Sequence, residues 1–172
     1  DVNVDMQMGN VEEIYRWVRE DKADMCFASR QEGINMEWMH LRDDPLLVIL
    51  PPYFDLGGAN SFPVRRFEGL DFLMPSPGFH QDITRALSAG GVSPNIRTTQ
   101  VSDSVIISMV EHGLGVSILS ELVLKGRKDD VLAVPLDPPA VRELGIAVRS
   151  KKELRPMAKR FMMEARETVA NM

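Results

Sequence analysis

The sequence has little of several residue types, and each shortage excludes a class of protein. Its 172 residues include a single cysteine, Cys26, so no disulfide can form within the chain, which fits a reducing, cytoplasmic compartment. No apolar run approaches the ~18 residues of a transmembrane helix, so no membrane partner is expected. Aromatic residues make up 6% of the chain, whereas methionine occurs 11 times. We therefore expect a core of Leu, Val, Ile and Met side chains.

The chain also lacks an excess of basic residues. Its formal net charge is −5 and its isoelectric point is near 5.2, whereas a surface that binds nucleic acid needs a basic face. These values argue against DNA binding by this chain, but they are compatible with a separate DNA-binding domain. The hydrophobic share of 44% and the charged share of 26% are those of an ordinary globular protein with one domain or two small lobes.

Motifs of catalysis and metal binding are missing from the sequence. His40, His80 and His112 are far apart and follow no metal-ligand spacing, and neither an HExxH motif nor a Walker loop occurs. No serine lies in a G-x-S-x-G motif. The string from Gly113 to Gly115 starts like a dinucleotide fingerprint but lacks its third glycine. We therefore expect no enzyme activity, no metal and no cofactor, and we interpret Cys26 as an inert core thiol.

Residues 101–121 carry the strongest structural pattern. The polar residues 102–104 precede apolar residues that fall on one helical face. Gly113 follows, and glycine commonly ends a helix because it adopts the left-handed conformation without strain. The apolar run 116–119 is typical of a strand that is buried on both faces. This order of elements predicts an α/β sheet.

The chain begins with Asp1 rather than methionine, and we interpret it as a fragment or a processed form. Residues 2–8 alternate apolar and polar side chains, which predicts a half-buried strand. Asn10 and Glu13 have the spacing of a capping box for a helix that starts at Val11. A second strand over 24–29 would then lie parallel to the first, joined by a right-handed crossover.

The remaining patterns complete two groups of elements. Strands are expected over 36–41, 46–50, 70–74, 95–101, 131–136 and 142–149, and helices are expected to start at Pro77 and Pro156. The last helix should bury Met157, Phe161, Ala165 and Val169. We expect one lobe from residues 1–46 with 138–172 and a second lobe from 47–137. Two connections between two lobes suggest a ligand cleft.

Four places could contribute ligand contacts. Asn10 lies at a strand-to-helix turn, where the alternative is a plain helix cap. Ser29 and Arg30 end a strand, where open α/β sheets place ligands. The guanidinium of Arg30 matches a carboxylate, and the alternative is a surface ion pair.

The other two places are helix starts, whose free N–H groups favour an anion. The first and strongest candidate is the string Ser76, Pro77, Gly78 and Phe79, in which the glycine permits a close backbone approach. The second is Ser102 with Asp103, where the carboxylate would repel an anion. An ordinary capped helix is the alternative at both.

Several strings together resemble the effector-binding domain of LysR-type transcriptional regulators. Their order over nearly the whole chain is more specific than any one of them, and the strings are 23–30, 36–52, 75–79, 110–119 and 134–139. The resemblance implies an α/β, two-lobed fold like that of type 2 periplasmic binding proteins. It also implies a small-molecule effector in the cleft, and DNA contact only through an N-terminal winged helix-turn-helix that this chain lacks.

The sequence departs from the family pattern at its start, and two other classes of protein are alternatives to a regulator. Relative to the family, we expect the first strand and helix to be missing, so that residues 2–8 form an exposed edge that a second subunit covers in a homo-oligomer. A solute-binding protein of a transporter would have the same fold, and the intact gene would distinguish the two by a helix-turn-helix or a signal peptide. A small enzyme on this fold is the second alternative, against which the missing catalytic motifs argue.

Overall fold

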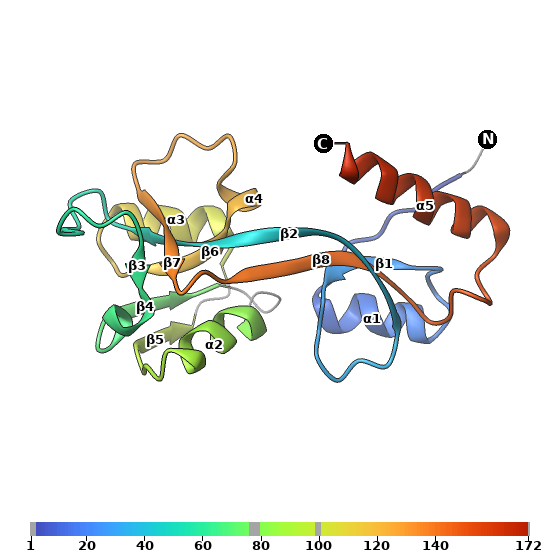
Figure 1. Ribbon diagram of the computed structural model, residues 1–172, viewed down its shortest axis with the longest axis horizontal. Coiled ribbons are helices and arrows are strands. Elements are labelled where there is room, and N and C mark those ends of the chain that lie inside the picture. The colour runs from blue at the N-terminus through green and yellow to red at the C-terminus, as the bar shows by residue number, and fades with distance from the viewer. Residues whose placement is uncertain (1–2, 76–79, 99–100, 172) are drawn as a thin grey trace. The chain divides into compact units, whose positions relative to one another are not determined.

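The structure is a computed structural model that describes residues 3–75, 80–98 and 101–171 (Figure 1). Contacts divide the chain into two compact units of mixed α/β structure, as the sequence predicted. Unit 1 comprises residues 1–43 and 143–172, and unit 2 comprises residues 44–142. The chain therefore changes units at 43/44 and 142/143, compared with the expected 46/47 and 137/138.

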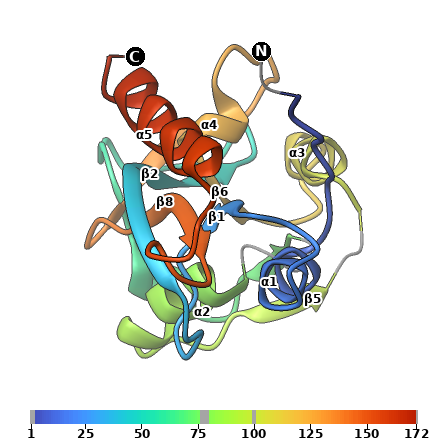
Figure 2. The ribbon, with the colours of Figure 1, turned by 90° about the vertical axis from the view of Figure 1, so that its right-hand side faces the viewer.

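Unit 1 is a small sheet with a helix on each face. The strand β1 (Cys26–Ser29) pairs antiparallel with β8 (Val141–Val148). Helices α1 (Val11–Arg19) and α5 (Pro156–Ala170) lie on opposite faces of these strands (Figure 2). Side chains of β8 alternate accordingly: Ala147 packs in the cluster with α1, whereas Ile146 and Val148 pack against Met162 of α5.

Two expectations for the start of the chain are wrong. Residues 3–8 form no strand, and Val4, Met6 and Met8 are exposed. The alternating pattern is necessary for a half-buried strand but does not supply the neighbouring strand whose hydrogen bonds hold it. The parallel crossover into β1 is consequently absent, because the strand with which β1 is paired is the antiparallel β8.

The strands expected over 36–41 and 46–50 are one continuous strand, β2 (Glu37–Leu50), which passes from unit 1 into unit 2. Pro45 lies inside this strand, where its missing N–H only removes one donor from the ladder. The next residue resumes the pattern, since the N–H of Leu46 donates to the carbonyl of Ala140 at 2.9 Å.

The buried face of α5 is also partly different from the prediction. Met162 is the buried residue of this helix and Ala165 packs beside it, whereas Met157 and Phe161 are exposed. The predicted stripe is thus rotated by about one residue, because a helix with apolar side chains around much of its surface leaves the choice of face to the sheet that it packs on.

Unit 2 is an open sheet in which β2 lies between β6 (Ser117–Ser120) and β7 (Leu132–Asp137), both antiparallel to it. The short β3 (Phe62–Pro63) pairs parallel with β7. On the other side β4 (Asp71–Met74) bridges to Val116, just before β6, and pairs parallel with β5 (Asn95–Thr98). The helical elements are η1 (Val64–Phe67), α2 (His80–Ala89), α3 (Asp103–Glu111) and α4 (Glu121–Leu124).

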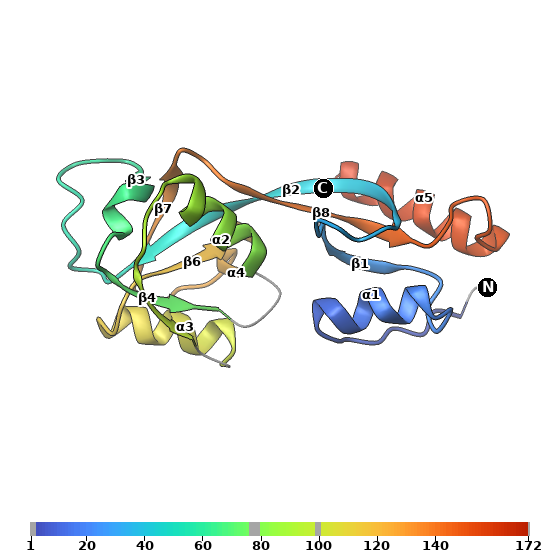
Figure 3. The ribbon, with the colours of Figure 1, turned by 90° about the horizontal axis from the view of Figure 1, so that it is seen from below.

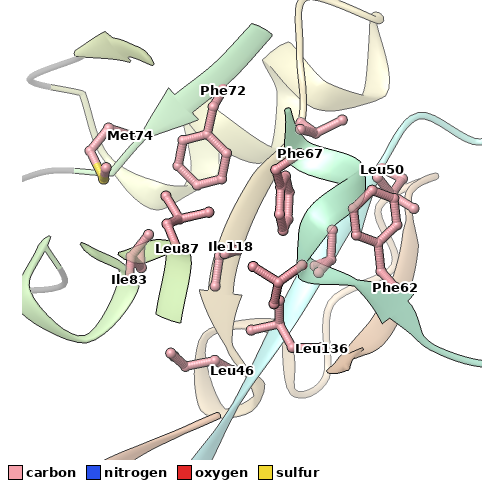
Figure 4. Close-up of a cluster of buried hydrophobic side chains, with 13 residues drawn as sticks. Leu46, Leu50, Phe62, Phe67, Phe72, Met74, Ile83, Leu87, Ile118 and Leu136 are labelled. Carbon is pink, nitrogen blue, oxygen red and sulfur yellow. The ribbon is translucent and has the colours of Figure 1, made fainter. Parts of the chain in front are cut away.

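Both faces of this sheet are buried. One face packs against α2 through Ile83 and Leu87, in a cluster that includes Phe62, Phe67 and Phe72 (Figure 4). The other face packs against α3 in a cluster that includes Ile49, Leu73 and Leu119 together with Ile106, Ile107 and Val110. Burial on both faces explains the continuous apolar runs in the sequence.

Gly115 permits the close approach of the segment before β6 to β4. Its φ is +156°, and a Cβ there would lie 2.7 Å from the carbonyl oxygen of Asp71. The N–H of Val116 donates to that same oxygen at 2.9 Å. Gly113, two positions before Gly115, has a φ of +76° and follows the C-cap of α3. This confirms that the helix ends at this glycine.

Candidate functional site

Polar residues gather in each unit at an edge where strands end and helices begin. In unit 1, α1 runs beside β1 (Figure 3) and the two are joined by a short turn, so the N-terminus of α1 lies near the C-terminal end of β1. In unit 2, β4 and β5 are parallel, so Met74 and Thr98 end their strands at the same edge of the sheet. Each unit is described by itself below.

Asn10 is the N-cap of α1. Its Oδ1 accepts a hydrogen bond from the N–H of Glu13 at 2.9 Å, and the Glu13 carboxylate accepts from the N–H of Asn10 at 2.9 Å. The capping box expected from the spacing is therefore present. The Asn10 side-chain oxygen is engaged in this cap, while its amide N–H₂ retains donor capacity toward a ligand.

Ser29 is buried at the end of β1 and is held from two sides. The hydroxyl of Tyr15 donates to the Ser29 carbonyl at 2.9 Å, and Nε2 of Gln31 donates to the Ser29 Oγ at 3.0 Å. Burial raises the pKa of Tyr15 to about 12, so this hydroxyl stays a donor at neutral pH. Ser29 is thus held by Tyr15 and Gln31, two contacts that were not expected from the sequence.

Arg30 is placed at the surface of the same edge. Its Nη1 lies 3.1 Å from Oε2 of Glu143, and the two side chains are 60% and 43% exposed. A pair this exposed contributes little to stability. In this structure Arg30 forms the surface ion pair that was the alternative to a ligand contact. Its guanidinium still retains donors for a ligand carboxylate.

In unit 2, some of the candidate site residues lie outside the described part of the chain. The strongest sequence candidate, Ser76 to Phe79, lies outside the described residues. Ser102 is the N-cap of α3 by backbone conformation, but its hydroxyl makes no capping hydrogen bond. Asp103 follows in the first turn and is partly buried. Burial raises the pKa of its carboxyl, while the charges of Arg142 and Arg127 oppose that rise.

A buried polar cluster that was not expected from the sequence lies at the carboxyl end of β6. Nη2 of Arg142 lies 2.6 Å from Oδ2 of Asp44 and 3.1 Å from Oγ of Ser120. Oδ1 of the same aspartate accepts from the N–H of Leu122, in the first turn of α4, at 3.1 Å. The signal in the sequence was an acidic residue beside the apolar run 46–50, but its partner is 98 residues away.

The arrangement suits the binding of a small polar molecule. Within the ranges that the structure describes, no group of three or more His, Cys, Asp or Glu side chains is placed to hold a metal ion. Over the same ranges, no helix is both long enough and apolar enough to cross a bilayer. The chemical resources at these edges are hydrogen-bond donors, two helix starts and guanidinium groups, which are the groups that hold carboxylates and other anions.

Comparison with known proteins identifies relatives along the whole chain. The family model of the LysR substrate binding domain matches residues 1–170. The HTH-type transcriptional regulator YvbU of Bacillus subtilis (strain 168), itself uncharacterized, is 26% identical over 161 residues, which are 92% of this chain and 55% of that regulator. The chain thus spans about half the length of this relative.

Solved structures show the same fold. The regulatory domain of Synechocystis PCC6803 CcmR, in complex with 2-PG, superposes with a TM-score of 0.82 at 21% identity and covers 95% of this chain and 81% of its own. The effector binding domain of QuiR, in complex with shikimate, gives 0.81 at 18% identity and covers 95% and 79%. These matches confirm the two-lobed fold that resembles periplasmic binding proteins, and the chain belongs to the LysR substrate-binding domain family.

Proposed function

We propose that this chain is the effector-sensing part of a cytoplasmic transcriptional regulator and that it binds a small anionic molecule. The observation that carries the proposal is the edge of unit 2, where the start of α3 at Ser102 and Asp103 lies within the electrostatic reach of the Arg142 guanidinium. A helix start and a guanidinium both attract an anion. Asn10, Ser29 and Arg30 of unit 1, and residues 76–79, which lie outside the described residues, remain candidate contacts from the sequence.

The kinds of relatives support regulation over transport or catalysis. The curated relatives are HTH-type transcriptional regulators, and the family itself is regulatory. In the proposed mechanism the effector shifts the population between two arrangements of the assembled regulator, and the DNA-binding domains of the full-length protein respond. This requires differential binding and no covalent chemistry.

The test is a thermal-shift screen of metabolites grouped by charge: monocarboxylates, dicarboxylates, phosphate esters and neutral sugars. A ligand at 100 times its dissociation constant adds about 2.7 kcal/mol of stability. We expect stabilisation by at least one anion and by no neutral sugar. A neutral ligand that binds as the sole effector would contradict the anionic class.

Variants then test the site with the ligand identified by the screen. Arg30→Ala should remove a charged contact of about 1.5–3 kcal/mol if it is buried with the ligand, and Gly78→Val should block the approach to the backbone. Arg160→Ala is the matched control, since this arginine lies on the exposed side of α5. Unchanged affinity in both site variants would refute the site assignment.

We also propose that the domain self-associates through unit 1. Apolar side chains are unusually exposed there: Phe27 is 50% exposed and stacks edge-on against the partly exposed Phe161, and Met6 and Met8 are almost fully exposed. Exposed apolar side chains that lie together, as Phe27 and Phe161 do, mark interaction surfaces. Sedimentation velocity should show dimers or larger species at micromolar concentration, and Phe161→Glu should shift them toward monomer. A parent protein that stays monomeric would refute this proposal.

A further inference from the structure

The chain changes units twice, and an unusual pair of residues marks the two points. One change occurs inside β2, between Asp43 and Asp44, and the other inside β8, between Arg142 and Glu143. Both strands continue without interruption through these points. Any change in the relation between the units must therefore bend these two strands.

The residues on the unit 2 side of the two points bind each other. Asp44 is 0% exposed and the Arg142 side chain is 13% exposed, with 2.6 Å between Oδ2 and Nη2. The pair is also tied to other elements, through Ser120 Oγ at the end of β6 and through the N–H of Leu122 at the start of α4. A buried ion pair with these additional hydrogen bonds is strongly destabilised when one partner is removed.

The side chains on the unit 1 side form exposed ion pairs. Asp43 lies 2.8 Å from Nε2 of His40, and Glu143 lies 3.1 Å from Nη1 of Arg30, with every one of these side chains at least 43% exposed. Such pairs are screened by water and salt and resist bending weakly. The crossing strands are thus held firmly on one side of the change and loosely on the other.

We propose that Asp44 and Arg142 form a clamp that fixes both crossing strands to unit 2, so that the strands bend on the unit 1 side. The clamp is a positioning device and does not depend on a ligand. The regulatory role of the clamp rests on the proposed function. Arg142 also interacts electrostatically with Asp103 at the start of α3, where that function places an anion. An anion bound at that helix start competes for the guanidinium that holds the strands, and binding then acts directly on the bending points.

The first test measures the distance distribution between spin labels on the two units by pulsed electron paramagnetic resonance, without any ligand. Labels are attached at Glu12→Cys on α1 and Ser88→Cys on α2, both exposed positions. The chain without these substitutions checks that the buried Cys26 takes up no label. The clamp variants are Asp44→Asn and Arg142→Met, and the matched control is Glu143→Gln, which breaks the neighbouring exposed pair.

We expect the distance distributions of both clamp variants to be broader than that of the parent. The distribution of the control should match the parent. A parental distribution in the clamp variants would overturn the proposal, as would equal broadening in Glu143→Gln. The double variant Asp44→Leu/Arg142→Met leaves no lone buried charge and keeps apolar packing. It should fold and still broaden the distribution, because its strands are no longer tied to Ser120 and α4. A folded double variant with the parental distribution would show that packing alone holds the strands.

The second test uses hydrogen exchange of the parent and needs no variant. The N–H of Leu122 is bonded to the clamp, whereas the N–H of Arg30 is bonded to the Glu143 carbonyl on the unit 1 side, at 2.9 Å. We expect the Leu122 amide to exchange about tenfold more slowly, after correction for intrinsic rates, which corresponds to about 1.4 kcal/mol of local stability. Equal or faster exchange at Leu122 would overturn the clamp. Because neither test uses a ligand, failure to find an effector would refute only the proposed function.

Discussion

The hydroxyl of Tyr15 in α1 donates a hydrogen bond of 2.9 Å to the carbonyl oxygen of Ser29, the last residue of β1. This bond fixes the helix to the strand end at which three candidate ligand contacts lie. Its donor is buried, and burial raises the pKa of Tyr15 from 10.0 to about 12, with the neighbouring Cys26 thiol as a second cause. The bond therefore makes unit 1 sensitive to alkaline pH.

The raised pKa of Tyr15 predicts that the folded protein loses stability at high pH. A group whose pKa is raised on folding contributes stability that is present below its unfolded pKa and is lost as pH rises to its folded pKa. For Tyr15 this window runs from about pH 10 to about pH 12. Absorbance at 295 nm should show Tyr15 ionising above the usual range of a tyrosine.

The variant Tyr15→Phe keeps the ring and removes the hydroxyl. It should lose the late ionisation and cost about 0.5–1.5 kcal/mol at neutral pH, the usual contribution of one hydrogen bond. Urea unfolding measures the cost. Persistence of the late step in this variant would contradict its assignment to Tyr15.

Cys26 is predicted to be unreactive in the folded protein. Burial raises its pKa from 9.0 to about 11, so only about one thiol in a thousand is ionised at pH 8, and the thiolate is the reactive form. A thiol-exchange reagent should react slowly with the native chain and rapidly after unfolding. Rapid stoichiometric reaction of the native chain would show that this thiol is accessible.

Asn10 is predicted to contribute to stability as a helix cap. Asn10→Ala removes the acceptor of the Glu13 N–H and should cost about 1 kcal/mol, whereas Asn10→Asp retains an acceptor and should cost little. Differential scanning calorimetry of both variants measures the effect. A ligand contact by Asn10 would appear separately, as weaker effector binding by the stable Asp variant.

Gly145 is predicted to be required by packing rather than by backbone conformation. A Cβ at this position would lie 2.4 Å from the carbonyl oxygen of Met39 and 2.5 Å from the Trp38 ring. Gly145→Ala should therefore cost about 1–3 kcal/mol through displacement of β8 from β2. Gly33→Asn is the control: nothing lies within 4 Å of a Cβ there, and asparagine tolerates its φ of +76°. A similar cost for both variants would contradict the packing explanation.

Asp103 is predicted to oppose an anionic effector. Burial raises the pKa of its carboxyl, so the carboxylate becomes neutral at a higher pH than an exposed aspartate as the solution is acidified. The affinity for an anion should rise as pH falls through this range, and Asp103→Asn should bind more tightly and lose that pH dependence. Isothermal titration across pH measures both, and weaker binding by Asp103→Asn would show that the carboxylate contributes to the site.

Patterns among residues that are close in the sequence determined much of this fold. The capping box at Asn10 and Glu13, the helix end at Gly113 and the apolar runs that became β2, β4 and β6 are all properties of neighbouring residues. Periodicity and capping depend on contacts within a few residues, so the sequence predicts them directly. The order of the expected elements also predicted two lobes, and the family resemblance supported them.

Tertiary structure decided what depends on distant partners. Residues 3–8 have the pattern of a strand but no neighbouring strand, and α5 buries Met162 while it leaves Phe161 partly exposed. The buried pair of Asp44 and Arg142 joins residues 98 positions apart. Sequence spacing carries no signal for such a pair, because only the pairing of strands brings its two charges together and removes them from water.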